Sequence, residues 1–260
     1  MIVFRGKAIV AILLSISISQ DSTCAAEDND QSARTGSFSL LATPTEIVGP
    51  DSAANFAAVI PVDEAINWQI TVPEFYDPDK SPGLLVYISP SNSGKMPRSW
   101  LSLPESHNFI WIGADQSGNR IAVARRVTMA LFAVGLVNKR YSIDSRRIYL
   151  SGFSGGARVA GLVAAAYPQI FKGDIYIGGA ETWEDELTPD KLEAMKQNRY
   201  VFIVGSDDFN RRMAREVAEK YTAAGIENIE LKIIAHMGHE LPRSRDMYDA
   251  LNYLDAAVEP

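Results

Sequence analysis

The sequence predicts an α/β protein in which a mainly parallel central sheet carries helices on both faces. Short apolar runs, typical of strands buried on both sides, alternate along the chain with segments whose apolar positions recur every three or four residues. Such an alternation of strands and amphipathic helices is typical of parallel sheets covered by helices. At 260 residues, the chain is long enough for one sizeable domain with a full core.

The first 26 residues have the pattern of a secretory signal peptide. Arg5 and Lys7 form a basic start, and residues 8–18 form an apolar stretch too short to span a bilayer comfortably. Small residues precede a cleavage site expected after Ala26, and an uncleaved anchor is the alternative. We therefore expect export to the periplasm or the cell exterior, with no stable membrane association after cleavage.

Cys24 is the only cysteine. Lipidation there is a further alternative, but the polar residues 21–23 disfavour it. Cleavage after Ala26 would leave a chain without disulfides or a cysteine nucleophile. Residues 27–45 are small and polar, so we expect a flexible leader, and the folded domain is expected to cover residues 46–260.

Within this domain the elements follow one another with no visible boundary or repeat. The expected strands cover residues 56–60, 66–72, 84–88, 109–113, 147–151, 174–178, 200–204 and 229–235. The expected helices cover about 119–138, the segment after Ser154, the segment between Met213 and Gly225, and about 243–257. Residues 181–199 form only a short polar insertion, so no large cap domain is expected.

Gly152-Phe153-Ser154-Gly155-Gly156 lies between an expected strand and an expected helix and fits the pattern G-x-S-x-G. A serine at such a sharp turn projects its hydroxyl clear of the sheet, and its close neighbours must lack side chains. The N–H of Gly155, at a helix N-terminus, can point at a developing oxyanion. Because Gly and Ser also crowd ordinary turns, a glycine-rich turn with a solvated serine is the alternative.

A serine hydroxyl becomes a good nucleophile only when a base takes its proton, and histidine is the usual base. Of the three histidines, His107 precedes the serine and is expected to be a surface loop residue. His236 stands at the end of the last expected strand, where a structural role is plausible. His239 follows Gly238 in a loop that can bring its imidazole over the sheet edge, so we favour His239.

The acid that orients the imidazole is expected directly after the 200–204 strand. Asp207 and Asp208 both lie there, and an N-cap of the following helix is the alternative role for either. The resulting chain order of serine, acid and histidine is the order found on the α/β-hydrolase plan.

Three segments together make residues 66–258 resemble the α/β-hydrolase superfamily, and within it the esterase and polyhydroxyalkanoate-depolymerase-like group. They are residues 152–156, Gly205-Ser206-Asp207-Asp208-Phe209-Asn210 and Met237-Gly238-His239-Glu240-Leu241-Pro242. In such enzymes the acid commonly stands three residues after the strand-ending glycine, which selects Asp208. The histidine commonly follows a glycine, which selects His239.

This resemblance implies a serine hydrolase that cleaves small-molecule or polymeric carboxylic esters through an acyl-enzyme, with Ser154, His239 and Asp208 as its triad and no cofactor. A peptidase or acyltransferase with the same residues is an alternative. A non-catalytic binding protein that keeps the fold is another.

The resemblance also implies a second oxyanion donor in the loop after the 84–88 strand, a loop often opened by His-Gly. This chain instead has Ser89-Pro90-Ser91-Asn92. Because Pro90 has no N–H, the alignment selects the N–H of Ser91, with that of Asn92 next, and a plain solvated loop is the alternative.

Two further pairs of side chains have chemistry that suits roles near the site. Trp100 and Trp183 are the aromatic candidates for substrate contact, with ordinary packing as the alternative. Asp115 and Asn119 are expected to cap the helix at 119–138 rather than touch substrate.

The sequence argues against several other classes of function. A net charge of −7 with no basic run disfavours nucleic-acid binding. Spaced His and Cys groups are absent, so no metal site is expected. Phosphate-binding loops of the G-x-x-x-x-G-K type and dinucleotide fingerprints are also absent.

Overall fold

The computed structural model describes residues 33–183 and 187–256, so the predicted signal peptide lies outside the described residues. These residues form one open eight-stranded sheet, in the order β1-β2-β4-β3-β5-β6-β7-β8. The strands are β1 (Gly36–Ala42), β2 (Ile66–Val72), β3 (Gly83–Ile88), β4 (Phe109–Ala114), β5 (Ile148–Phe153), β6 (Gly173–Ile177), β7 (Arg199–Gly205) and β8 (Ile229–Ile234). β2 pairs antiparallel with both β1 and β4, and every other neighbouring pair, from β4 across to β8, is parallel. The expected mainly parallel sheet is confirmed.

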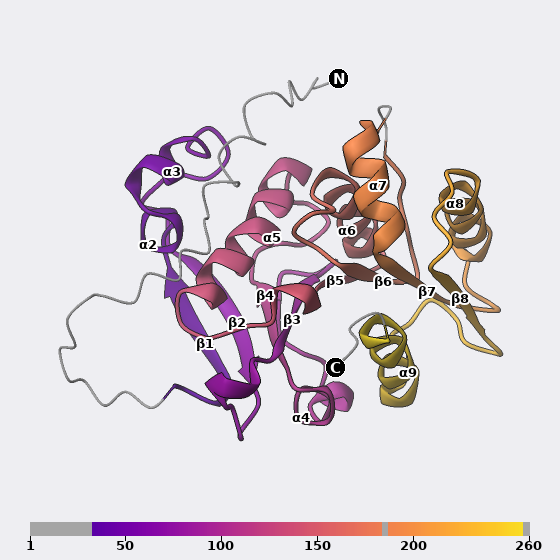
Figure 1. Ribbon diagram of the computed structural model, residues 1–260, viewed down its shortest axis with the longest axis horizontal. Helices are drawn as coiled ribbons and strands as arrows, with labels where there is room; N and C mark the ends of the chain where they lie inside the picture. Colours follow the sequence, from indigo (N-terminus) through magenta and orange to yellow (C-terminus); the bar gives the residue numbers. More distant parts are fainter. Residues whose placement is uncertain (1–32, 184–186, 257–260) are drawn as a thin grey trace.

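Helices cover both faces of this sheet, as the sequence predicts (Figure 1). The helices are α2 (Pro44–Val48), α3 (Pro50–Ala54), α4 (Leu103–His107), α5 (Val123–Asn138), α6 (Gly155–Ala166), α7 (Pro189–Gln197), α8 (Arg211–Ala223) and α9 (Ser244–Asp255). Side chains of α2, α5, α6, α7 and α8 pack on one face, and those of α4 and α9 pack on the other. Within the described residues, no helix is both long enough and apolar enough to cross a membrane.

The central strands explain why the apolar runs are unbroken. All residues of β3 and β4 are buried, and successive side chains of a strand point to opposite faces. Val86 therefore joins the core under α5 and α6, whereas its neighbour Leu85 joins the core under α9. A strand covered on both faces has no solvent side, so it needs no polar alternation.

The expected flexible leader is wrong from Gly36 onward. β1 pairs along its whole length with β2, and its alternate residues Phe38 and Leu40 turn toward the core. Thr43 then starts α2 with a capping box, because its hydroxyl accepts the Glu46 N–H while the Glu46 carboxylate accepts the Thr43 N–H. The leader residues before 33 lie outside the described part of the chain.

Two other expected elements differ from the structure. Residues 56–60 form turns after α3 rather than a strand, although Phe56 and Ile60 are buried as apolar residues should be. The long helix begins at Val123, not at Asn119, with Ala122 as its N-cap. Residues 115–119 form a loop instead, because the Asn119 N–H donates to the Pro90 carbonyl.

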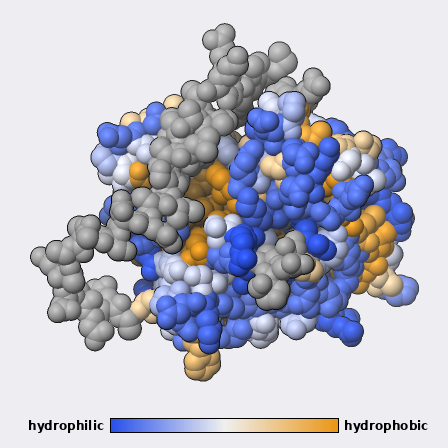
Figure 2. Space-filling model, in the orientation of Figure 1, coloured by the Kyte–Doolittle hydropathy of each residue, from blue (hydrophilic) through white to orange (hydrophobic). Residues whose placement is uncertain are grey.

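The last strand of the sheet, β8, is more exposed than the central strands β3 and β4. Figure 2 shows hydrophilic residues over much of the visible face, with apolar residues gathered over β8. β8 is the last strand of the sheet, and each of its residues is half-buried.

Candidate active site

Ser154 lies at the turn where β5 ends and α6 begins. Its backbone has φ 55° and ψ −120°, a conformation that costs a non-glycine residue about 1–3 kcal/mol. The Ser154 N–H donates to the Ile177 carbonyl at 2.8 Å, which fastens the turn to β6. The expected strand, sharp turn and helix are confirmed, and the strain lifts the serine out of the sheet.

The glycines around Ser154 are required by close packing. A Cβ on Gly152 would lie 2.5 Å from the Gly156 carbonyl carbon. A Cβ on Gly156 would collide with the Ile88 carbonyl oxygen, and a Cβ on Gly155 would collide with the side chain of Asn119. The G-x-S-x-G spacing is therefore a steric requirement of this turn.

A continuous line of hydrogen bonds joins three of the sequence-selected side chains. His239 Nε2 lies 2.9 Å from Ser154 Oγ, and His239 Nδ1 lies 2.9 Å from Asp208 Oδ2. The Asp208 side chain is fully buried, whereas that of His239 is 22% exposed. With Nδ1–H donating to the carboxylate, Nε2 is left to accept the serine proton.

Asp208 is held by the turn that follows β7. Its Oδ1 accepts the Asn210 N–H at 2.7 Å, and the Asn210 side-chain amide donates to the Gly178 carbonyl at 2.8 Å. α8 begins only at Arg211, with Asn210 as its N-cap. Neither Asp207 nor Asp208 caps that helix, so the alternative role for the two acids is wrong.

Two phenylalanines that the sequence analysis did not select flank the imidazole. The ring centroids of Phe153 and Phe209 lie 4.9 and 4.3 Å from that of His239. Phe209 is 77% exposed, which is unusual for a large apolar side chain. The sequence indicates both only by position, since Phe153 precedes Ser154 and Phe209 follows Asp208.

The neighbouring acid and histidines do not join the line. Asp207 is exposed and accepts the Ser206 hydroxyl, and His236 is exposed with its N–H bonded to Ser206 Oγ. His107 was expected at the surface but is buried at the end of α4, with Nε2 3.1 Å from Asn252 Oδ1. Burial lowers the pKa of His107.

The two predicted oxyanion donors differ in their availability. Gly155 is the first residue of α6, so its N–H has no intrahelical acceptor. The Ser91 N–H instead donates to Ser89 Oγ at 3.1 Å. The expectation that Ser91 offers a free N–H does not hold in this arrangement, because a serine two residues earlier takes that donor.

The two tryptophans expected at the mouth differ in exposure, since Trp100 is buried and Trp183 is half-buried. Trp100 is fully buried in the core under α9, and its Nε1 donates to the Pro242 carbonyl at 3.0 Å. Trp183 packs on Tyr221, near the end of α8. At 1.5 Å per residue, Tyr221 is about 15 Å along α8 from its first residue, Arg211. The contact assignment of Trp100 is wrong, because a side chain without exposed surface cannot touch substrate, and that of Trp183 stays a prediction.

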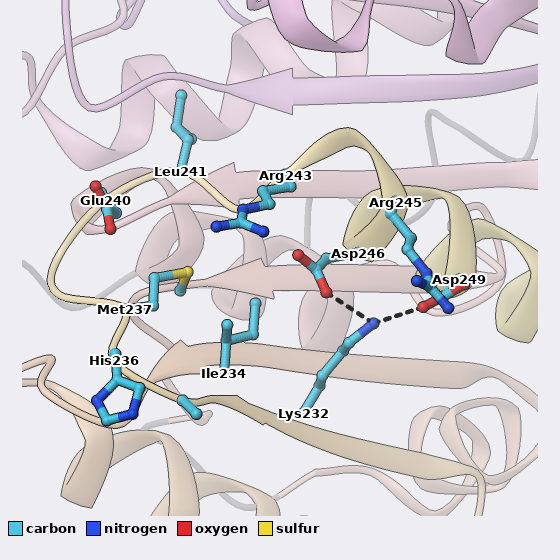
Figure 3. A pocket seen from close by; sticks show the side chains of 11 residues that line it. Lys232, Ile234, His236, Met237, Glu240, Leu241, Arg243, Arg245, Asp246 and Asp249 are labelled. Atoms are coloured by element: carbon cyan, nitrogen blue, oxygen red, sulfur yellow. Dashed lines mark hydrogen bonds and ion pairs between the residues drawn. The ribbon is translucent and has the colours of Figure 1, made fainter.

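A cavity lies behind the loop that carries His239. It has a volume of about 820 Å³ and is bounded by β8, the 235–241 loop and the start of α9 (Figure 3). Lys232 Nζ spans one side of it, 3.0 Å from Asp246 and 2.7 Å from Asp249. None of Ser154, Asp208 and His239 lines this cavity.

In the described ranges 33–183 and 187–256, no three His, Cys, Asp or Glu side chains gather as metal ligands would.

Comparison with solved structures shows which known fold this chain has. The feruloyl esterase module from Clostridium thermocellum superposes with a TM-score of 0.62 at 12% identity, over 90% of this chain and 94% of that chain. A thermostable esterase superposes with a TM-score of 0.53 at 14% identity, over 75% of this chain and 59% of that one. This chain has the α/β-hydrolase fold. Dipeptidyl peptidase 4 from Porphyromonas gingivalis shares this α/β-hydrolase core with a TM-score of 0.53 at 17% identity, over 74% of this chain and 34% of that one.

These likenesses concern the fold, because the identities are low. The chain spans about three-fifths of the thermostable esterase and about a third of the peptidase. No family model and no curated protein matches the sequence.

Proposed function

We propose that this α/β-hydrolase-fold protein is an exported serine hydrolase that cleaves carboxylic esters. The observation that carries the proposal is the line from Ser154 Oγ through His239 to the buried Asp208, with 2.9 Å at each step. A strained serine, a base within hydrogen-bond reach and an acid on the far ring nitrogen together have the geometry of an activated nucleophile.

The proposed reaction begins with attack of Ser154 Oγ on the ester carbonyl carbon. As the new C–O bond forms, the serine proton passes to His239 Nε2 and the carbonyl π electrons move to the oxygen. The Gly155 N–H stabilises that oxyanion. His239 then gives its proton to the leaving alcohol, which leaves an acyl group on Ser154.

Water completes the proposed cycle. His239 takes a proton from water, the hydroxide attacks the acyl carbon, and the collapse of the second oxyanion returns the proton to Ser154. Asp208 keeps His239 in the productive tautomer and stabilises its charged form.

A peptidase is the second candidate, because one of the structural neighbours is named a peptidase. The same line of residues can attack an amide. Esters are the first choice because several neighbours that superpose over most of the chain are named esterases.

The deciding experiment compares the wild type with Ser154→Ala on p-nitrophenyl esters and on peptide amides, with fluorophosphonate labelling of the serine. Loss of the nucleophile should lower kcat about a millionfold and abolish labelling. Ser93→Ala, in an exposed loop, is the matched control and should behave as wild type. A wild type that neither labels nor turns over esters would favour the binding-protein alternative, whereas labelling with amide turnover alone would favour the peptidase.

Export forms a separate part of the proposal. Full-length chain and a chain beginning at residue 27 should differ in location after expression, with only the first leaving the cytoplasm in mature form. N-terminal sequencing of the secreted form then tests cleavage after Ala26. Equal retention of both chains would contradict export.

A further inference from the structure

The loop after β3 offers few backbone donors for an oxyanion. Pro90 has no N–H, and the N–H of Ser91 is taken by Ser89 Oγ at 3.1 Å. The Gly94 N–H donates to Asp115 Oδ1 at 2.8 Å. The Asn92 N–H is the one backbone donor of residues 90–92 without an acceptor in the described part of the chain. A tetrahedral intermediate gains most from two donors on one oxygen, and a side chain on the facing loop is the other candidate partner for Gly155.

The side chain of Asn119 lies against Gly155. The three atoms nearest to a Cβ built on Gly155 are all of one group, the Asn119 side-chain amide. Asn119 is exposed, and its amide has no hydrogen-bond partner among the residues that the structure describes. An amide without a structural bond, next to the helix residue whose N–H is the proposed oxyanion donor, is free to donate to substrate.

The backbone of Asn119 is fixed even though its amide is free. Its N–H donates to the Pro90 carbonyl at 2.9 Å, and the Gln116 N–H donates to the Asn92 carbonyl at 3.0 Å. Gln116 has φ 53°, a left-handed conformation that costs a non-glycine residue energy. A Cβ on Gly118 would lie 2.7 Å from Asn92 Oδ1, so the two loops are in close contact.

The buried guanidinium of Arg126 holds the loop after β3, which the Asn119 loop contacts. Arg126 is 4% exposed, and its Nη2 donates to the Ser89 carbonyl at 3.0 Å. It forms no ion pair within the described ranges. Hydrogen bonds therefore fix the backbone that carries Asn119, as a pre-organised donor requires.

We propose that Asn119 is the second oxyanion donor of this site, with its side-chain amide N–H bonding the substrate carbonyl oxygen beside the Gly155 N–H. Rotation about the terminal torsion exchanges the amide oxygen and nitrogen, so the N–H₂ can face the substrate. The inference rests on the proposed serine hydrolysis and adds a substrate-contacting residue from the loop after β4.

The test uses Asn119→Ala and Asn119→Asp in the full-length protein. Loss of one oxyanion donor should lower kcat about 100- to 1,000-fold, with KM nearly unchanged because the bond strengthens only as charge develops. Asp keeps the shape but replaces the donor with a negative acceptor, so its loss should be the larger one. Affinity for a trifluoromethyl ketone, whose serine adduct carries an oxyanion, should fall by the same factor as kcat/KM.

Asn138→Ala is the matched control, since Asn138 is also an exposed asparagine and lies at the last residue of α5. It should keep the wild-type kcat, and all variants should keep the wild-type unfolding temperature. An active wild type with an unchanged Asn119→Ala would overturn this inference alone, as would equal losses in Asn138→Ala. An unlabelled, inactive wild type would overturn the proposed function and this inference with it.

Discussion

Asp208 and Asp174 are both buried carboxyl groups in the same half of the sheet, yet only Asp208 has hydrogen-bond partners among the described residues. Asp208 follows β7, and its two oxygens bond the Asn210 N–H and His239 Nδ1. Asp174 lies within β6 with no exposed surface, and neither oxygen has a hydrogen-bond partner in the described part of the chain. Burial raises the pKa of Asp174 well above its usual range.

The difference shows that partners, rather than burial, prepare a carboxylate for use. A buried carboxyl without donors keeps its proton, because an unpaired charge in a low-dielectric interior is costly. The loops at the carboxyl ends of parallel strands supply free N–H groups and mobile side chains, whereas the backbone groups inside β6 are already bonded to β5 and β7. The candidate site therefore lies at the strand ends, and Asp174 has no part in it.

Removal of the partner that Asp208 orients should have the largest effect. His239→Ala leaves Ser154 without a base and should lower kcat about a millionfold. The control, His236→Ala, removes an exposed imidazole outside the hydrogen-bond line and should keep nearly full activity. Steady-state ester hydrolysis and fluorophosphonate labelling measure both variants. The opposite ranking of the two histidines would contradict the assignment.

A smaller loss is expected from the carboxylate itself. Asp208→Asn keeps the shape but favours the wrong imidazole tautomer, so kcat should fall about 10,000-fold. Asp207→Asn alters an exposed side chain bonded only to Ser206 and should change kcat little. The same ester assay compares the pair, and equal small losses would remove the distinction between the two neighbouring acids.

The smallest expected effect is on the stability of the fold, and it concerns Asp174. A carboxyl whose pKa is raised on folding stabilises the fold below its unfolded pKa of about 3.9, and that stabilisation is lost as the pH rises toward the folded pKa. The free energy of unfolding should thus decline by up to about 1.4 kcal/mol per pH unit above pH 4. Asp174→Asn should remove this slope.

Chemical denaturation of the wild type and of Asp174→Asn between pH 5 and 8 measures that slope. Asp190→Asn, at an exposed position in α7, is the control and should keep the wild-type pH dependence. If wild type and Asp174→Asn had parallel profiles, Asp174 would have to be charged in the fold, and the contrast with Asp208 would disappear.

Local properties of the chain were sufficient for most of the fold. The expected strand at 66–72 matches β2 at both ends, because its apolar residues Ile66, Trp68, Ile70 and Val72 alternate with polar ones and all join one core. Gly225 has φ 81° directly after the last turn of α8, as a glycine that stops a helix should. β1 was not predicted, because its alternation of Phe38 and Leu40 with serines is short and stands in an otherwise small and polar segment, which forms a strand by pairing with β2.

The sequence by itself determined the alternation of strands and helices and the glycine-bounded turn at Ser154, because each depends on residues a few positions apart. Only the tertiary structure decided which side chains meet Ser154, since His239 is 85 residues away in the chain. The same holds for the burial of Trp100 against Pro242 and for the contact between Asn119 and Gly155. Distances between remote segments are set by how the whole core packs, which no short pattern of residues encodes.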